Sequence, residues 1–133
     1  MITSSTNIEV RYAETDMMGI AHHASYLPWL EIARGNLLKE RGISYAKLEE
    51  SGILLPVVEL KMNYRRPTTY DDVVTINSLI KERSFAKIRV DYELQKGGQP
   101  IADGYSIHAF MNESGQPIKA PRFITETLAK EFD

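Results

Sequence analysis

The stretch that decides the fold is 25-SYLPWLEIARGNLLKERG-42, whose pattern predicts one long helix from Ser25 to about Arg41. Its apolar residues recur at the i, i+3, i+4 spacing of a helix face, and Ile32 widens that face. Ser25 is a suitable N-cap, and Pro28 falls in the first turn, where its missing N–H costs little. A helix that is apolar around so much of its circumference needs structure on several sides. The apolar face consists of Tyr26, Trp29, Leu30, Ala33, Leu37 and Leu38.

Most of the sequence beyond residue 52 alternates in the manner of β-strands, with β-branched and aromatic residues enriched. Turn-forming residues separate these runs, and short connections predict that successive strands are antiparallel neighbours. We therefore predict an α+β fold, in which a single antiparallel sheet of about five strands wraps around one long central helix. The predicted strands are Asn7–Tyr12, Leu54–Arg66, Val73–Arg83, Phe85–Gln95 and Pro100–Met111, with further helices at Ser44–Ser51 and Arg122–Phe132.

Composition narrows the possible functions. A length of 133 residues predicts one domain spanning 1–133. The net charge of -2 and the absence of a basic run argue against a nucleic-acid partner. The chain has no cysteine, which excludes disulfides and thiolate catalysis and fits a reducing, cytoplasmic compartment. We expect neither a signal peptide at Met1–Asn7 nor a membrane span. Three histidines without metal-ligand spacing predict no metal site and no cofactor.

The residues that precede the long helix are those expected to carry chemistry. They place Asp16, Gly19, His22 and His23 at the helix N-terminus, where unpaired N–H groups meet the positive end of the helix dipole. Such an end can hold a carbonyl oxygen as negative charge develops on it. A nearby carboxylate can then attack the carbonyl carbon or activate a water molecule.

This stretch resembles the hotdog-fold thioesterases of the 4-hydroxybenzoyl-CoA thioesterase type, especially their bacterial acyl-CoA thioester hydrolase branch. The similarity extends more weakly through residues 63–67 and Asp71, so that it covers most of the chain. It identifies a family and a reaction class, and it leaves the acyl group open. The matching residues are Tyr12, Thr15, Asp16, Gly19, His23, Ser25, Tyr26 and Glu31.

The resemblance implies roles for individual residues. Asp16 matches the catalytic aspartate, which acts as nucleophile or general base, and the backbone N–H of His23 matches the group that polarises the thioester carbonyl. Tyr12 matches a tyrosine near that aspartate. The implied substrate is an acyl-CoA, or an acyl-carrier-protein thioester, and the implied assembly is a homodimer or homotetramer. Substrate contacts are expected from Gly19, Ile20, His22, Ser25 and Arg66.

Simpler interpretations exist for several of these residues. His22, which stands where the branch often has an aromatic residue, is also typical of an exposed loop. Glu31 suits a solvated helix position, although other hotdog branches use a helix glutamate as catalyst. We expect His108 to be structural, because it lies in a strand without an acidic or histidine neighbour at ligand spacing. The apolar residues Trp29, Leu30, Ile32 and Leu37 are expected to be core first and acyl pocket second.

Two other functional classes remain open at this point. A hotdog hydratase or dehydratase acts on the same kind of thioester, but it places its aspartate and histidine in a different local pattern. A non-catalytic acyl-CoA-binding module would have no need of Asp16 in this context. Only the thioesterase releases free CoA.

Overall fold

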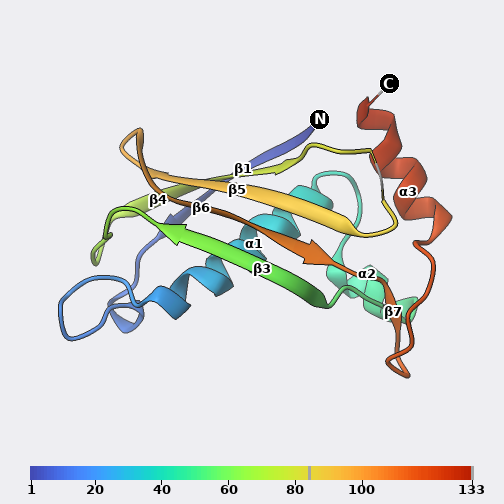
Figure 1. The fold of residues 1–133 in the computed structure, drawn as a ribbon, viewed down its shortest axis with the longest axis horizontal. Helices are drawn as coiled ribbons and strands as arrows, with labels where there is room; N and C mark the ends of the chain where they lie inside the picture. The colour runs from blue at the N-terminus through green and yellow to red at the C-terminus, as the bar shows by residue number, and fades with distance from the viewer. Residues whose placement is uncertain (84, 133) are drawn as a thin grey trace.

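One antiparallel sheet and the helix against it form the centre of the computed structural model, which describes residues 1–83 and 85–132 (Figure 1). The sheet strands are β1 (Ile2–Glu9), β3 (Val57–Tyr64), β4 (Val73–Ile80), β5 (Ile88–Lys96) and β6 (Gln99–His108). The helices are α1 (Tyr26–Lys39), α2 (Tyr45–Glu50) and α3 (Arg122–Ala129). The order of the strands across the sheet is β1-β4-β5-β6-β3, and every neighbouring pair is antiparallel. The predicted α+β architecture is confirmed. The shorter elements are β2 (Ile53–Leu54), β7 (Met111–Asn112) and the 3-10 helices η1 (Tyr12–Glu14), η2 (His23–Ser25) and η3 (Lys130–Phe132).

Helix α1 buries the face that the sequence predicted, with one exception. Trp29 and Leu30 are each 1% exposed, because they point at the sheet, and each such burial contributes about 1.5–3 kcal/mol. Ile32 is 50% exposed, so its assignment to the core is wrong. The sheet covers only one side of the helix, and Ile32 lies on the side that points away from it.

Strand β1 begins earlier and ends earlier than predicted, and Tyr12 starts a 3-10 helix instead of ending the strand. Its polar residues Ser4 and Thr6 are buried. Ser4 donates a hydrogen bond to Glu40, and Thr6 accepts one from Asn36, so side chains at the end of α1 satisfy both hydroxyls. A polar run without apolar alternation therefore forms an edge strand.

The prediction that successive strands are neighbours is wrong for β3 and β4. Residues 65–72 connect them, yet β5 and β6 lie between them, because β3 pairs with β6 and β4 pairs with β1 and β5. β3 therefore occupies one edge of the sheet and β1 the other. The connection carries the chain from one half of the sheet to the other.

Helix α1 packs mainly against β1 and β4, and its first residue, Tyr26, also meets Tyr64 at the β3 edge. Leu60 and Tyr64 pair with Ser106 and Ala102, which are buried on the helix side of the sheet. Residues directly opposite each other on paired strands share a face. Leu60 and Tyr64 therefore point to the helix side, yet they remain 43% and 47% exposed.

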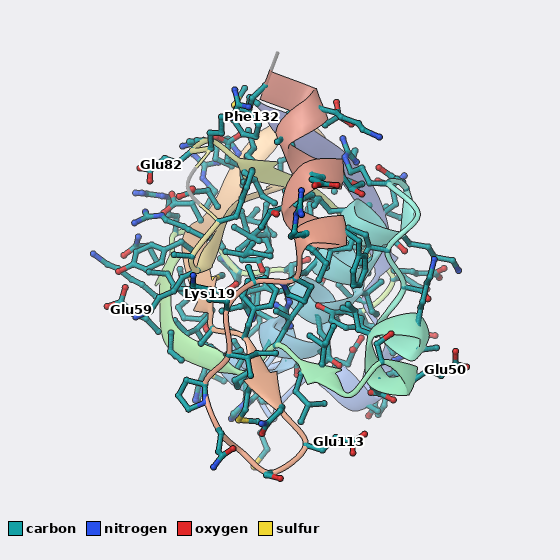
Figure 2. All side chains as sticks on the ribbon, turned by 90° about the vertical axis from the view of Figure 1, so that its right-hand side faces the viewer. Glu50, Glu59, Glu82, Glu113, Lys119 and Phe132 are labelled. Carbon is teal, nitrogen blue, oxygen red and sulfur yellow. The ribbon has the colours of Figure 1, made fainter. Side chains whose placement is uncertain are left out.

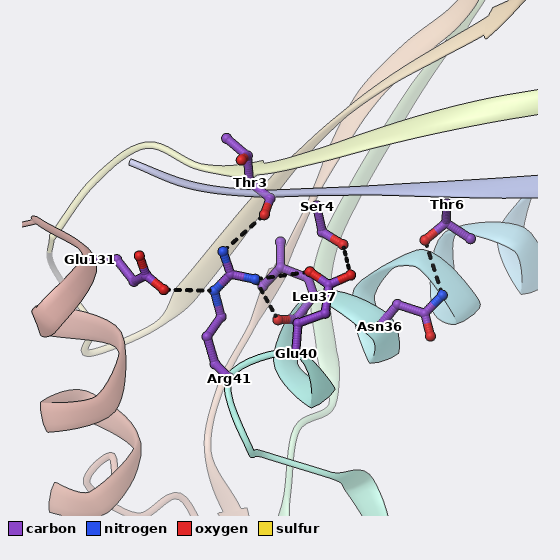
Figure 3. A network of polar contacts seen from close by, with 8 residues as sticks. All are labelled: Thr3, Ser4, Thr6, Asn36, Leu37, Glu40, Arg41 and Glu131. Carbon is purple, nitrogen blue, oxygen red and sulfur yellow. Dashed lines mark hydrogen bonds and ion pairs between the residues drawn. The ribbon is translucent and has the colours of Figure 1, made fainter.

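The C-terminal helix is anchored to the end of α1 through Arg41 (Figure 3). The Arg41 guanidinium donates to the Thr3 carbonyl at 2.9 Å and pairs with Glu40 and with Glu131, beyond α3. Helix α3 also buries Ile124 against the core. Seen from this end of the molecule, α3 runs along the front (Figure 2). None of the helices within residues 1–83 and 85–132 is long and apolar enough to cross a bilayer.

Candidate active site

The loop before α1 folds back on itself and presents Asp16. The Asp16 N–H donates to the Ile20 carbonyl at 2.8 Å, and the Gly19 N–H donates to the Asp16 carbonyl at 3.0 Å. Gly19 has a φ of +79°, a left-handed conformation that glycine adopts at little cost. Asp16 Oδ1 accepts a hydrogen bond from the Met18 N–H at 2.8 Å. The carboxylate is therefore oriented by its own loop.

A second turn, after β3, holds this loop in place. The Ala21 N–H donates to the Thr68 carbonyl at 2.8 Å, and Ile20 forms a β-bridge with Thr69. Asp72 organises the turn: the Thr69 N–H and the Lys96 ammonium both bind its carboxylate and lower its pKa to about 2. The Asp16 loop is thus fixed to the sheet by backbone hydrogen bonds.

The chain enters α1 through the η2 turn, whose hydrogen bonds differ from the prediction. His22 Nδ1 accepts from the Ala24 N–H at 3.1 Å, so that His22 caps the turn. Ser25, predicted as the N-cap of α1, caps no N–H with its side chain and donates its hydroxyl to the Glu14 carbonyl at 2.9 Å. Within the described part of the chain, the His23 N–H donates to no acceptor. It is free to bind a ligand carbonyl.

Glu14 is a buried carboxylate that the sequence did not identify. It is 8% exposed and accepts hydrogen bonds from Trp29 Nε1 at 2.7 Å and from the Arg11 N–H at 2.8 Å. Burial acts to raise the pKa of Glu14, but these hydrogen bonds outweigh it and hold the pKa below its usual value. Its carbonyl accepts from the His22 N–H and from Ser25 Oγ. Glu14 therefore supports the whole η2 turn from behind.

Asp16 and His23 line one open groove of about 370 Å³. In Figure 1 the loop that carries them lies at the left, near the arrowhead of β3. Tyr64 lies at that end of β3, and its hydroxyl donates to the His23 carbonyl at 2.9 Å. Burial raises the pKa of Tyr64, so its hydroxyl stays protonated and can donate. The groove is lined by Asp16, Met18, Ile20, Ala21, His23, Tyr26, Tyr64, Arg65, Arg66 and Pro67.

The structure thus brings four predicted site residues together in this groove: Asp16, Ile20, His23 and Arg66. The Arg66 guanidinium donates to Gln99 Oε1 at 2.9 Å.

The other predicted site residues lie outside the lining of the groove. Tyr12 is 77% exposed and stacks edge-on against Tyr70 at 5.8 Å. Gly19 shapes the loop, while His22 and Ser25 hold the η2 turn. Glu31 lines a different groove, farther along α1. Tyr64 and Glu14 are the residues that the sequence did not single out. A buried tryptophan needs an acceptor for its N–H, which could have pointed to Glu14.

His108 is buried in a hydrogen-bonded chain away from this groove. The chain runs from Arg34 Nη1 to the Tyr92 hydroxyl (3.1 Å), Ser106 Oγ (2.7 Å), His108 Nε2 (2.8 Å) and, from Nδ1, the Leu55 carbonyl (3.3 Å). Burial, and then the charge of Arg34, lower the pKa of His108 to about 4. Among the described residues, no three His, Cys, Asp or Glu side chains gather as metal ligands would.

Comparisons with known proteins agree with this geometry. Residues 10–129 match the family model of the thioesterase-like superfamily. The Bacillus subtilis protein YneP, provisionally named an acyl-CoA thioesterase, is 36% identical over 121 residues, which are 90% of this chain and 88% of the relative. The long-chain acyl-CoA thioesterase FadM of Escherichia coli is 32% identical over 100 residues, 74% of this chain and 75% of FadM.

A comparison with a solved structure also matches the chain to a thioesterase. The DHNA-CoA thioesterase of Staphylococcus aureus superposes with a TM-score of 0.93 and is 32% identical, covering 99% of this chain and 92% of that one. Both the sequence match and the superposition include the Asp16 loop and α1. The chain therefore belongs to the thioesterase-like superfamily and is a thioester hydrolase of the hotdog fold, the enzyme class that its sequence predicted.

Proposed function

We propose that the protein hydrolyses acyl-CoA thioesters in the groove between the Asp16 loop and the end of β3, with Asp16 as the catalytic carboxylate. The observation that carries this proposal is the juxtaposition of two groups in one groove. Asp16 supplies a carboxylate, and His23 supplies a backbone N–H that has no acceptor among the described residues. Thioester hydrolysis needs both kinds of group. The acyl-CoA thioesterases among the relatives support the choice of substrate.

The reaction can proceed in two ways from this geometry. As nucleophile, the Asp16 carboxylate attacks the thioester carbon, the C–S bond breaks, and CoA leaves as a thiolate that takes a proton. Water then hydrolyses the mixed anhydride to the free acid and restores the carboxylate. As general base, Asp16 removes a proton from water while the oxygen of that water attacks the thioester carbon. The C–S bond then breaks, the free acid forms, and the CoA thiolate takes the proton back from Asp16. In both cases the His23 N–H stabilises the negative charge that develops on the carbonyl oxygen.

Free-thiol release from a panel of acyl-CoAs tests the proposal. The wild-type protein should release CoA, and Asp16→Asn should lower kcat roughly a hundredfold or more, because an amide neither attacks nor accepts a proton near neutral pH. KM should change little, since binding rests on contacts elsewhere. A variant with near-wild-type turnover would remove Asp16 from the mechanism. The same panel distinguishes chain length and aromatic preference, and acyl-carrier-protein thioesters belong in it.

We also propose that two copies pair through β3. This strand has a pairing partner on one side only, and Val57, Val58 and Leu60 are 50%, 51% and 43% exposed. An exposed apolar edge strand is a template for pairing with another chain. Such a dimer extends the sheet and encloses the open groove, and a pair of dimers gives the homotetramer that the resemblance implies.

The proposal also covers the contact with the CoA phosphates and the location of the protein in the cell. Arg66, which lines the groove, is proposed to bind a CoA phosphate, because the arginine fork suits phosphate oxygens. The cytoplasm is the proposed location, because a chain without cysteine suits a reducing compartment.

A further inference from the structure

Tyr64 reaches the η2 turn from a strand 41 residues away. Its hydroxyl donates to the His23 carbonyl at 2.9 Å. Its ring stands edge-on to the Tyr26 ring, with centroids 5.0 Å apart and planes at 77°. Tyr26 is the first residue of α1 and is 3% exposed. The phenol is therefore held by a buried ring and points at the backbone of the residue whose N–H is free.

The η2 turn is held by hydrogen bonds on two sides, and Tyr64 provides one on the groove side. On the buried side, the Glu14 carbonyl accepts from the His22 N–H and from Ser25 Oγ. These bonds fix the two ends of the turn. On the groove side, Tyr64 provides the hydrogen bond to the His23 carbonyl, and it lines the groove together with Asp16.

The peptide plane between His23 and Ala24 is held at both of its polar groups. Its carbonyl accepts from Tyr64, and its N–H donates to His22 Nδ1. A peptide unit is planar, so the backbone moves only through φ and ψ. The preceding peptide plane, which carries the free His23 N–H, is held at its carbonyl, because the His22 carbonyl accepts from the Ser25 N–H at 2.8 Å. The two soft angles at His23 join these planes, so the N–H keeps one direction only while both planes are held. Loss of the Tyr64 hydroxyl releases the carbonyl of the His23–Ala24 plane, so that the direction of the His23 N–H is held from the His22 side only.

We propose that Tyr64 is a positioning residue, which orients the His23 N–H toward the thioester carbonyl without touching the reacting atoms. This inference rests on the proposed function. Stabilisation of a developing oxyanion depends on donors that are oriented before the reaction, so the hydroxyl contributes mainly to the transition state. Its removal affects kcat more than KM.

Tyr64→Phe removes the hydroxyl and keeps the ring against Tyr26. We expect kcat for acyl-CoA hydrolysis to fall roughly tenfold, the effect of losing one oriented hydrogen bond, with KM changed less than about twofold. The melting temperature should stay close to that of the wild type. Tyr105→Phe is the matched control, because the Tyr105 hydroxyl bonds Glu59 farther along β3, and neither residue lines the groove. That variant should keep the wild-type kcat.

A spectroscopic measurement separates positioning from general stability. In the Asp16→Asn background, a bound acyl-CoA labelled with ¹³C at its carbonyl should show a thioester stretch at lower frequency than in water. Addition of Tyr64→Phe should reverse part of that shift, and addition of Tyr105→Phe should not. An unchanged band or an unchanged kcat in Tyr64→Phe overturns the inference alone. A wild-type protein that releases no CoA from any acyl-CoA overturns the proposed function and this inference with it.

Discussion

Acid should destabilise the fold through protonation of His108. This loss of stability should occur at a higher pH than the loss caused by protonation of the carboxylates. His108 is 1% exposed, and its pKa falls to about 4 from an ordinary value of 6.5. The unfolded chain therefore binds a proton at pH 5 that the folded chain does not. Because the folded pKa is the lower one, this contribution to stability is complete above pH 6.5 and is lost as the pH falls toward 4.

The hydrogen-bonded chain explains why the folded protein excludes the proton. Arg34 can only donate and the Leu55 carbonyl can only accept, so the donors run in one direction when His108 is neutral. The order is Arg34 to Tyr92, Ser106, His108 and Leu55. Protonation turns His108 Nε2 into a donor, which reverses the two hydroxyls and leaves the Tyr92 proton without an acceptor.

A difference of 2.5 pKa units corresponds to roughly 3 kcal/mol when the full range is crossed, at about 1.4 kcal/mol per unit. Between pH 7 and pH 5 the linkage amounts to about 2 kcal/mol of unfolding free energy. The carboxylates respond at lower pH: Asp72, with a pKa of about 2 against an ordinary 3.8, loses its contribution below about pH 4. As the pH falls, the loss of stability from His108 therefore comes before the loss from the carboxylates.

Urea unfolding at pH 7, 6 and 5 measures this effect, with His108→Gln as the comparison. Glutamine can bond Ser106 and Leu55 but cannot titrate. His22 and His23 are exposed and present in both proteins, so they cancel in the difference. Wild-type protein should lose about 2 kcal/mol more than the variant between pH 7 and pH 5. Parallel curves for the two proteins would refute the reasoning.

Three further predictions follow from other parts of the molecule. Val58→Lys should shift the oligomer toward monomer in light scattering, because a charge on an edge strand blocks pairing; Val73→Lys, at the same 51% exposure on an interior strand, should not. Gly104→Ala should destabilise the protein by about 1–3 kcal/mol in urea unfolding, because a Cβ there overlaps the Lys61 carbonyl oxygen. Prolonged EDTA treatment should leave thiol release unchanged, and a loss that one divalent ion restores would reveal a metal site.

Local signals in the sequence were sufficient for most elements. The apolar spacing from Tyr26 to Leu38 gave α1, and the helix predicted at Ser44–Ser51 is α2, which the structure caps with the Ser44 hydroxyl. The start of β1 could not be predicted, because Ser4 and Thr6 are buried only through partners at the end of α1. The order of strands in the sheet likewise depends on tertiary contacts. The short connection between β3 and β4 therefore does not show that they are neighbours.

The candidate site also contains residues that local sequence signals predict and residues that only tertiary contacts reveal. Asp16 and His23 were predicted from a contiguous motif, and they line one groove. Residues 63–67 include Tyr64 within the weaker similarity, but its role could not be found in this way, because its hydrogen bond to His23 spans 41 residues and exists only once β3 lies beside the turn. Tyr12 is the opposite case: it lies within the motif, yet the 3-10 helix directs it toward Tyr70 and away from the groove lining.

The sheet order also determines when the chain can fold during its synthesis. Among the described strands, β1 pairs with β4 alone, so that Ile2 meets Ile80 and Glu9 meets Val73. The N-terminal strand and α1 therefore leave the ribosome before the strands that cover them. Contacts of such long range slow folding relative to helical bundles of similar size. During that interval the apolar face of α1 is exposed, which makes it the segment where a chaperone or a second nascent chain would bind first.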